Sequence, residues 1–335
     1  MKTGPLALTL GDPAGVGPEI VAKAWAELRG AGPAFVAVGD AQALASAPGA
    51  AAGLVRRVTT PDEALRIFPD ALPVLDLPLR APVVAGQPSA AAAPAIIQWI
   101  ETAVGLALRG DVSGVVTAPI AKAPLYEAGF KFPGHTEFLG ELTQATSYDG
   151  ARGPIMMLTA ADLRVTLVTV HDPIARVPSL LSVERIVNAG LVTAQALRRD
   201  FGIREPRLAV AGLNPHAGEG GGIGREEIEV VEPAVRALRD LGVDAAGPYP
   251  ADTLFPEPMR ALYDAALCLY HDQALIPVKM LDFWGGVNVT LGLPIVRTSP
   301  DHGTAFDIAG RGVARPDSLI AAIRLAEQIA RTRAA

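Results

Sequence analysis

Residues 5–40 read PLALTLGDPAGVGPEIVAKAWAELRGAGPAFVAVGD, and this stretch decides the fold class. It opens with a short apolar run, PLALTL, which has the length of a buried strand. PEIVAKAWAELRG follows with apolar residues at helical spacing, and Pro18 lies near its first turn, where a helix accepts proline. A second strand-like run, AFVAVGD, ends the stretch. This order predicts a β-α-β unit, and such units build largely parallel sheets.

The same alternation continues along the chain. We expect a strand at 72–77, a long helix at 89–110 and a strand at 114–119. Residues 154–171 contain two β runs around a short connection at 160–162, which predicts an antiparallel hairpin. Later segments predict helices at 183–200, from 225 and from about 316, with strand-like runs at 207–214, 266–271 and 287–298. The pattern indicates an α/β protein of two lobes with a cleft between them.

The composition limits the classes of partner. The chain has 335 residues, a net charge of −6 and a pI near 5.5, so it offers no basic face to nucleic acid or anionic membranes. The longest uncharged run, residues 81–100, carries three prolines and is not expected to span a membrane. A single cysteine, Cys268, excludes a disulfide within the chain and is expected to be a small buried side chain. We therefore expect a cytoplasmic protein without nucleic-acid or membrane partners.

Three of the five histidines follow strand-like runs. His171 ends LVTVH, His216 ends AVAGLNPH, and His271 ends LCLYH. Because ligands of parallel α/β sheets bind at the carboxyl ends of strands, the three imidazoles can converge on one divalent metal, such as zinc. A histidine in such a position is more often a hydrogen-bonding residue, and the spacings match no short zinc motif. Both interpretations stay open on the residues alone.

Two acidic residues lie where they can support such a metal. Asp272 is the neighbour of His271, and Asp252 lies in PADTLF. A carboxylate beside a ligating imidazole fixes the orientation of its ring. For Asp252, capping of a turn after Pro250 is an equally good explanation.

An anion site is predicted by three polar residues near the end of the chain. Lys279, Asn288 and Arg297 each interrupt an apolar stretch, where a charged or polar group is costly unless it has a partner. A shared phosphate or carboxylate explains Lys279 and Arg297 together, and a solvated edge explains any one of them. Neither GxGxxG nor GxxxxGK[ST] occurs, so a nicotinamide cofactor would need a site other than a Rossmann fingerprint.

Six strings of the sequence identify a family. They are GDPAGVGPE, PGHTEF, GLNPHAGEGG, PADTLF, YHDQALIPVK and GVNVTLGLPIVRTSPDHGTAFDIAG. Together they resemble the 4-hydroxythreonine-4-phosphate dehydrogenase family of pyridoxal phosphate biosynthesis, and the match covers nearly the whole chain. GDPAGVGPE and HGTAFDIAG are also similar to the GDGIGPE and HGSAPDIAG strings of isopropylmalate dehydrogenases. The resemblance implies a two-lobed α/β fold like that of isopropylmalate dehydrogenase, with mixed sheets flanked by helices and a cleft between the lobes.

The resemblance also implies domains and residue roles. One α/β domain, 1–130 plus 275–335, would hold both termini, and a second, 131–274, would carry the metal-ligand histidines and the dimer contacts. The metal ligands would be His171, His216 and His271, with His271 supplied across the interface of a homodimer. Substrate-binding positions would be His135, Thr136, Lys279, Asn288 and Arg297. Cofactor contacts would come from Gly303, Thr304 and Asp307.

The implied reaction is oxidation of 4-phosphohydroxy-L-threonine at C3 by NAD or NADP. It would use one divalent metal per active site, for which zinc, magnesium and cobalt are the candidates. The resulting β-keto acid would lose carbon dioxide and give 3-amino-2-oxopropyl phosphate. Lys279 and Arg297 would balance the charge of a phosphate or a carboxylate.

Three departures from the family pattern concern the exact substrate. They are His-Asp-Pro-Ile at 171–174, Ala121 where asparagine is frequent, and Trp-Gly at 284–285 before GVN. The nearest alternatives are therefore dehydrogenases of 4-phosphoerythronate, 4-phosphothreonate or aromatic cis-dihydrodiols. A zinc hydrolase or aldolase, and a non-catalytic phosphate-binding protein, are alternatives from other classes. The absence of HxH and HExxH, together with the HGTAFDIAG string, argues against the first of these.

Overall fold

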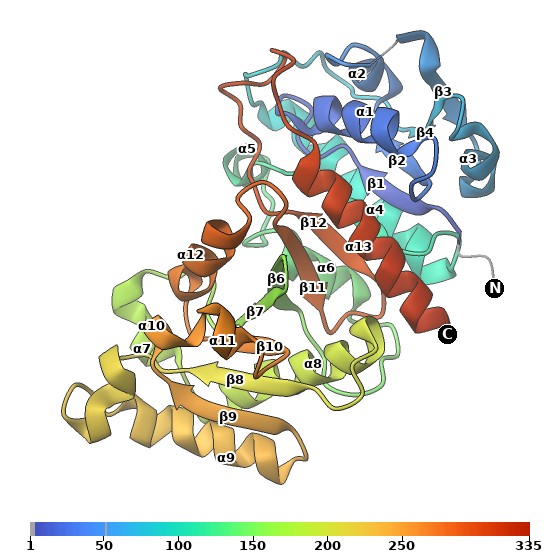
Figure 1. The fold of residues 1–335 in the computed structure, drawn as a ribbon. Coiled ribbons are helices and arrows are strands. Elements are labelled where there is room, and N and C mark those ends of the chain that lie inside the picture. The colour runs from blue at the N-terminus through green and yellow to red at the C-terminus, as the bar shows by residue number, and fades with distance from the viewer. Residues whose placement is uncertain (1–3, 51) are drawn as a thin grey trace. The chain divides into compact units, whose positions relative to one another are not determined.

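The structure, a computed structural model, describes residues 4–50 and 52–335, which form two compact units (Figure 1). The first unit comprises the described residues up to Ser147 together with Pro294–Ala335, and the second is Tyr148–Leu293. The predicted ranges, 1–130 plus 275–335 and 131–274, have earlier boundaries, and their residues 1–3 lie outside the described part.

Tertiary packing explains the difference in boundaries. Helix α6 (His135–Thr143) packs against α4 (Ala93–Arg109) and so belongs to the first unit. Strand β11 (Val287–Leu291) pairs antiparallel with β6 (Ile155–Ala160) and so belongs to the second. Both contacts join segments far apart in sequence, which local periodicity does not report.

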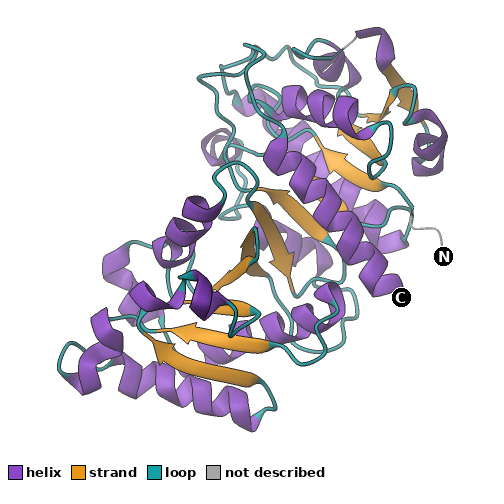
Figure 2. Cartoon of the chain, in the orientation of Figure 1, coloured by secondary structure: helices purple, strands orange, loops and turns teal. Residues whose placement is uncertain are grey.

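The first unit is built on a parallel sheet with the strand order β3-β4-β2-β1-β5-β12. Its strands are β1 (Leu6–Thr9), β2 (Phe35–Gly39), β3 (Val55–Val58), β4 (Leu72–Asp76), β5 (Val115–Thr117) and β12 (Arg297–Pro300). The helices, on both faces of the sheet (Figure 2), are α1 (Gly17–Leu28), α2 (Ala41–Ala45), α3 (Pro61–Ile67), α4, α5 (Lys122–Glu127), α6 and α13 (Asp317–Ala334). Strands covered on both faces are apolar throughout, as the runs PLALTL and AFVAVGD are.

The order of these strands creates a topological switch point between β1 and β5. From β1 the chain continues through α1 to β2, whereas β5 lies on the other side of β1. The loops that follow β1 and β5 meet here, where the Asp12 amide donates to the Pro119 carbonyl at 2.8 Å. Open parallel sheets bind their ligands outside such a switch point, at the carboxyl ends of the strands.

The second unit has a mixed sheet with the order β11-β6-β7-β10-β8-β9. Its remaining strands are β7 (Leu163–Leu167), β8 (Arg207–Ala211), β9 (Asp244–Tyr249) and β10 (Ala265–Cys268). Strands β6 and β7 form the predicted antiparallel hairpin, and β7, β10, β8 and β9 run parallel. The helices are α7 (Val177–Leu180), α8 (Val183–Phe201), α9 (Glu232–Asp240), α10 (Ala251–Leu254), α11 (Glu257–Arg260) and α12 (His271–Leu281). The predicted α/β architecture with helices around a mixed sheet is confirmed.

Two apolar features have ordinary roles in the core. Cys268 is fully buried in β10, and burial raises the pKa of its thiol, so it packs as a small apolar side chain as predicted. The segment Ala90–Arg109 is long and apolar enough to cross a membrane by length and composition. In this structure its helix, α4, packs against β1, β2 and β5 and buries Trp99 completely. It serves here as a core helix.

Candidate functional site

The three histidines of the second unit follow three adjacent parallel strands. His171 comes after β7, His271 after β10 and His216 after β8, and β10 pairs with both of the others. All three therefore lie beyond the carboxyl edge of one sheet, as the sequence predicts from the strand ends. The edge therefore carries three imidazole nitrogen donors, which are ligands that transition metals favour.

Two of these imidazoles are close neighbours. The ring centroids of His171 and His271 are 5.9 Å apart. Asp272 places its Oδ1 2.7 Å from Nδ1 of His271, at the first turn of α12. A carboxylate on Nδ1 fixes the ring and leaves Nε2 available to a ligand. Asp272 therefore contacts the imidazole that it is predicted to support. Asp252 is exposed in α10 and has no described contact with an imidazole.

His216 lies in an unusual backbone turn. Five successive residues, 216–220, have positive φ angles between 44° and 80°. The left-handed region costs a residue with a side chain about 1–2 kcal/mol, and His216, Ala217 and Glu219 all adopt it. Backbone strain of this kind concentrates at functional sites, where the surrounding structure maintains it. The His216 side chain is 68% exposed, and its Nδ1 lies 3.0 Å from Glu219 Oε2.

Within one chain these three residues do not complete a metal site. The described residues contain no group of three or more histidine, cysteine or acidic side chains close enough to hold an ion. His216 reaches the same sheet edge by a separate loop.

A second group of polar residues lies at the switch point of the first unit. Arg297, at the start of β12, is only 3% exposed, and its Nη2 donates to Thr117 Oγ1 at 2.7 Å. Burial lowers the pKa of Arg297 to about 10, and the nearby Glu137 carboxylate opposes this shift. The guanidinium is still charged at neutral pH. Arg297 begins β12, but its guanidinium reaches Thr117, the last residue of β5, and a buried cation there is suited to binding an anion.

Helix α6 brings further polar groups to Arg297. His135 and Thr136 form its first turn, and His135 Nε2 is buried without a hydrogen-bond partner among the described residues. Burial, followed by the charge of Arg297, lowers the pKa of His135 well below its ordinary value, so the ring is neutral at pH 7. Lys122 and Glu137 both lie beside Gly134, the residue before the helix. A neutral imidazole can donate to one substrate oxygen or accept from one hydroxyl.

The structure adds residues that the sequence argument missed. Thr117 contacts Arg297, Lys122 approaches the start of α6, and Thr9 Oγ1 is buried without a described partner at the end of β1. Asp12, in the loop after β1, is also buried, and burial raises the pKa of its carboxyl. The signal was present in the sequence, because all four follow or end strand-like runs on either side of the switch point.

Lys279 and Asn288, the other predicted substrate residues, belong to the second unit. Lys279 lies in α12, one helix with His271, and its Nζ is 5.2 Å from the centre of the Phe283 ring. Asn288 lies in β11, where its Nδ2 contacts Met156 Sδ and its Oδ1 is buried without a partner among the described residues. A buried amide oxygen without a donor is an acceptor site for a ligand group such as an amine or hydroxyl.

The two strings shared with isopropylmalate dehydrogenases meet in the first unit. The Val16 amide donates to the Thr304 carbonyl at 2.9 Å, and Gly15 has no room for a side chain beside Thr304. Glu19, which is 2% exposed, accepts from the amides of Gly312 and Ala314. The loop after β12 is therefore fixed on the loop after β1, with Gly303 and Asp307 exposed along it.

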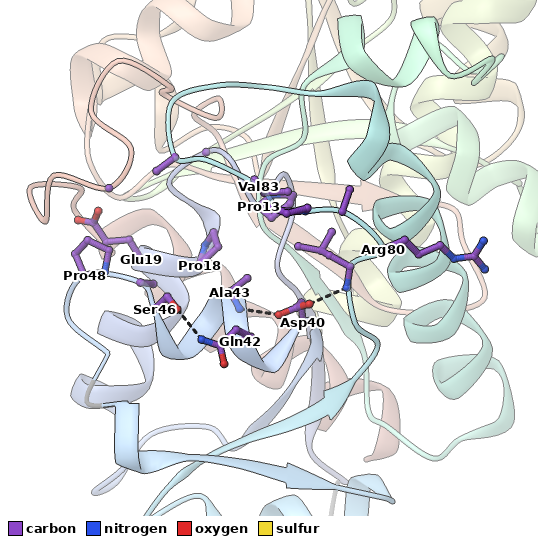
Figure 3. Close-up of a pocket in the computed structure, with 17 residues that line it drawn as sticks. Pro13, Pro18, Glu19, Asp40, Gln42, Ala43, Ser46, Pro48, Arg80 and Val83 are labelled. Carbon is purple, nitrogen blue, oxygen red and sulfur yellow. Dashed lines mark hydrogen bonds between the residues drawn. The ribbon is translucent and has the colours of Figure 1, made fainter.

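A cavity of about 740 Å³ opens beside this junction. Pro13, Gly15 and Gly310 line it together with residues of the segments that follow β2 and β4, and Figure 3 shows Pro13 beside Val83. Asp40, also in the lining, accepts from the amides of Ala43 at 2.6 Å and Leu79 at 2.7 Å. The cavity is large enough for part of a nucleotide and lies at the carboxyl ends of the strands.

The chain is similar to known proteins over its whole length. Residues 32–326 match the family model described as pyridoxal phosphate biosynthetic protein PdxA. The chain is 72% identical over 333 residues to the 4-hydroxythreonine-4-phosphate dehydrogenase of Caulobacter vibrioides, covering 99% of each.

Two solved structures extend this similarity to the fold. The 4-hydroxythreonine-4-phosphate dehydrogenase of Klebsiella pneumoniae has a TM-score of 0.84 and 42% identity, covering 98% of this chain and 100% of that one. A terephthalate 1,2-cis-dihydrodiol dehydrogenase from Burkholderia xenovorans has a TM-score of 0.63 and 32% identity, covering 98% of each chain. The resemblance that the sequence motifs carry is confirmed. The chain belongs to the PdxA family of pyridoxal phosphate biosynthetic proteins.

Proposed function

We propose that this chain oxidises 4-phosphohydroxy-L-threonine at C3 with NAD or NADP in a metal-dependent reaction. The product is a β-keto acid that decarboxylates to 3-amino-2-oxopropyl phosphate. The observation that carries the proposal is the arrangement of His171, His271 and His216 after three adjacent parallel strands. We place the reacting hydroxyl at that edge of the sheet, and the 72% identity to a 4-hydroxythreonine-4-phosphate dehydrogenase supports the choice of substrate.

The residues fit a divalent metal held by imidazoles. His171 and His216 of one subunit would supply two imidazoles and the partner subunit's His271 a third, whose ring Asp272 fixes. Nitrogen donors favour zinc or cobalt over magnesium, which prefers oxygen. When bound, the metal would make the C3 hydroxyl more acidic, and the nicotinamide would accept the hydride.

The side chains of the protein bind and orient the substrate. Arg297 and Lys122 offer positive charge to the phosphate near the first turn of α6, where backbone amides favour anions. His135, neutral at pH 7, and Thr136 offer hydrogen bonds at the same place. Asn288 Oδ1 accepts a hydrogen bond from the substrate amino group. Lys279 balances the charge of the substrate carboxylate, or it moves a proton at the carbon from which that carboxylate leaves.

The cofactor is proposed to bind beside the loop at residues 302–310. Gly303, Thr304 and Asp307 remain the proposed contacts, and the cavity of about 740 Å³ next to Gly310 has space for the adenosine half. Of the charged residues that line the cavity, Glu19 and Asp40 are acidic and Arg80 is the basic one. The acidic lining suits a free ribose hydroxyl better than a 2′-phosphate, so NAD is the favoured form.

A homodimer is supported by an apolar surface on the helix that begins with His271. The side chains of Ile276, Met280, Phe283 and Trp284 are between 51% and 82% exposed along α12 and the turn after it. Contiguous exposed apolar side chains mark protein interfaces. A second copy of the chain seated here would bring its His271 close to the boundary between subunits, as a shared active site requires.

We propose the cytoplasm as the location of this dimer.

Met280→Lys is expected to shift the dimer toward monomers. Met280 is 82% exposed, and a charge at the centre of an apolar interface costs about 2 kcal/mol or more, which is roughly a 30-fold weaker association. Sedimentation over a range of protein concentrations measures the change. Leu241→Lys is the matched control, because Leu241 is 59% exposed at the end of α9, away from α12. An unchanged dissociation constant in Met280→Lys would remove this surface from the interface.

The reaction is tested by NADH formation with four substrates. They are 4-phosphohydroxy-L-threonine, 4-phosphoerythronate, 4-phosphothreonate and a cis-dihydrodiol, each measured with added divalent metal and again after chelation. Metal-dependent turnover of the first compound alone is the expected result. The similarity to the Burkholderia enzyme makes the dihydrodiol the most informative alternative, since its turnover would keep the mechanism and change the substrate.

A further inference from the structure

We propose that Glu227 is a positioning residue that sets the place of the His216 imidazole. It does so by holding residues 213–220 in their left-handed turn. The inference rests on the proposed function, because it takes His216 as a metal ligand. Glu227 lies outside the six family strings of the sequence.

The turn needs an external support. His216, Ala217 and Glu219 have φ angles of 54°, 50° and 44°, and the two glycines between and after them have 80° and 62°. Residues with side chains leave this region unless other contacts oppose the change. The His216 side chain is itself 68% exposed, so packing of the imidazole does not hold the turn.

Glu227 supplies that support through hydrogen bonds to the residues that precede the turn. It is 1% exposed, and its Oε1 accepts from the amides of Leu213 at 2.8 Å and Asn214 at 2.7 Å. Its Oε2 accepts from Asn214 Nδ2 at 2.9 Å. A buried carboxylate that accepts three hydrogen bonds is strongly held in place. All of these bonds reach the two residues that lead into the turn.

The closing side of the turn also rests on the same carboxylate. A side chain at Gly218 would lie 2.6 Å from Glu227 Oε2, so only glycine allows the backbone to approach this closely, and Gly218 has a φ of 80°. Glu227 begins the helical segment Glu227–Val231, which continues into α9, and Val231 and Ala234 are fully buried. The turn is therefore fixed to a rigid part of the core.

The test is metal binding by Glu227→Gln. Glutamine has the same shape and keeps one oxygen for the Leu213 and Asn214 amides, but its Nε2 would face the Asn214 Nδ2 donor, so that hydrogen bond is lost. We expect the affinity of the metal-stripped protein for Co²⁺, measured by calorimetry, to fall about 10- to 100-fold, as it does when a residue that orients a ligand is changed. Glu229→Gln is the matched control, since Glu229 is exposed on the same helical segment and pairs with Arg225. It should bind Co²⁺ like the original protein.

A double-mutant cycle separates positioning from general stabilisation. In a His216→Ala background, Glu227→Gln should cause no further loss of Co²⁺ affinity, because its effect passes through that imidazole. The same loss in both backgrounds, or no loss in the original background, would overturn the proposal. Thermal unfolding of all variants shows how much of each change is stability.

Hydrogen exchange distinguishes this proposal from the proposed function. If the original protein binds no Co²⁺, the metal-dependent function fails, and amide exchange at residues 213–220 then decides the role of Glu227. Faster exchange in Glu227→Gln than in Glu229→Gln supports positioning, and equal exchange refutes it. If Glu227→Gln does not fold, Asn214→Ala replaces it, because this change removes only the Nδ2 bonds to Glu226 and Glu227. A several-fold loss of Co²⁺ affinity is then expected, and unchanged affinity would contradict the proposal.

Discussion

His216→Ala is expected to abolish turnover and to lower the bound metal while the protein remains folded. Loss of a metal ligand removes several kcal/mol of stabilisation from the reacting oxygen, which corresponds to a rate reduction of more than about a thousandfold. The His216 side chain is 68% exposed, so its removal leaves no cavity in the core. Steady-state NADH formation, together with the metal content of purified protein, measures both effects.

The backbone at His216 offers a sharper comparison. Its φ of 54° strains alanine as much as histidine, whereas glycine adopts it freely. His216→Gly should therefore be inactive like His216→Ala and yet more stable to heat than the alanine variant, by about 1 kcal/mol. Full activity with unchanged metal content in either variant would exclude His216 from the metal site.

Arg297→Met is expected to lower kcat/KM by about 30-fold to several thousandfold, since loss of one partner from a buried charge pair costs about 2–5 kcal/mol. Methionine fills most of the volume of the side chain, which is 3% exposed in the interior. The protein gives up a buried charge, so its free energy of unfolding should stay the same or rise. Kinetics with 4-phosphohydroxy-L-threonine and thermal unfolding make the measurement.

The sign of the change in unfolding free energy distinguishes a substrate-binding role of Arg297 from a structural one. A structural ion pair would make Arg297→Met less stable and only modestly less active. Arg297→Lys keeps the charge but loses the planar group that donates to Thr117, so a partial recovery of kcat/KM is expected. Activity of Arg297→Met within about threefold of the original protein would exclude a substrate contact, because even a single hydrogen bond to a charged group is worth about 1.5–3 kcal/mol.

Strong local patterns predicted the fold best. The hairpin at 154–171 was identified from two apolar runs and a short connection, and the structure forms it as β6 and β7. The helix expected at 183–200 is α8, which Ser182 caps at its start. In each case the element is predicted by its own residues, through the spacing of apolar side chains or through a capping residue at its start.

Edge strands escaped prediction for a physical reason. Strand β3 reads VRRV, with both arginines exposed, and β9 reads DAAGPY. Each lies at the outer edge of its sheet, where one side has no neighbouring strand and little apolar surface is buried. Such strands form because they pair with a neighbouring strand, and the local sequence pattern carries no information about that neighbour.

The candidate site was predictable where residues follow strands and unpredictable where distant loops meet. His171, His216 and His271 stand out in the sequence because each comes after an apolar run. Thr117 and Lys122 follow β5 in the same way, but their relevance depends on Arg297 and α6 lying beside them. Glu227 is recognisable only once the turn at residues 213–220 is seen to rest on it.

The division of the chain into two units has a consequence for its synthesis. The second unit, Tyr148–Leu293, is one uninterrupted segment, so a ribosome releases all of it before the first unit is complete. Strand β12, which pairs with β5, and helix α13, which packs on β12, are made after it. Until they emerge, the first unit presents an unpaired strand to other nascent chains, and exposed edges of this kind favour aggregation. The sheet that carries Arg297 is therefore completed only after the whole inserted unit has been made.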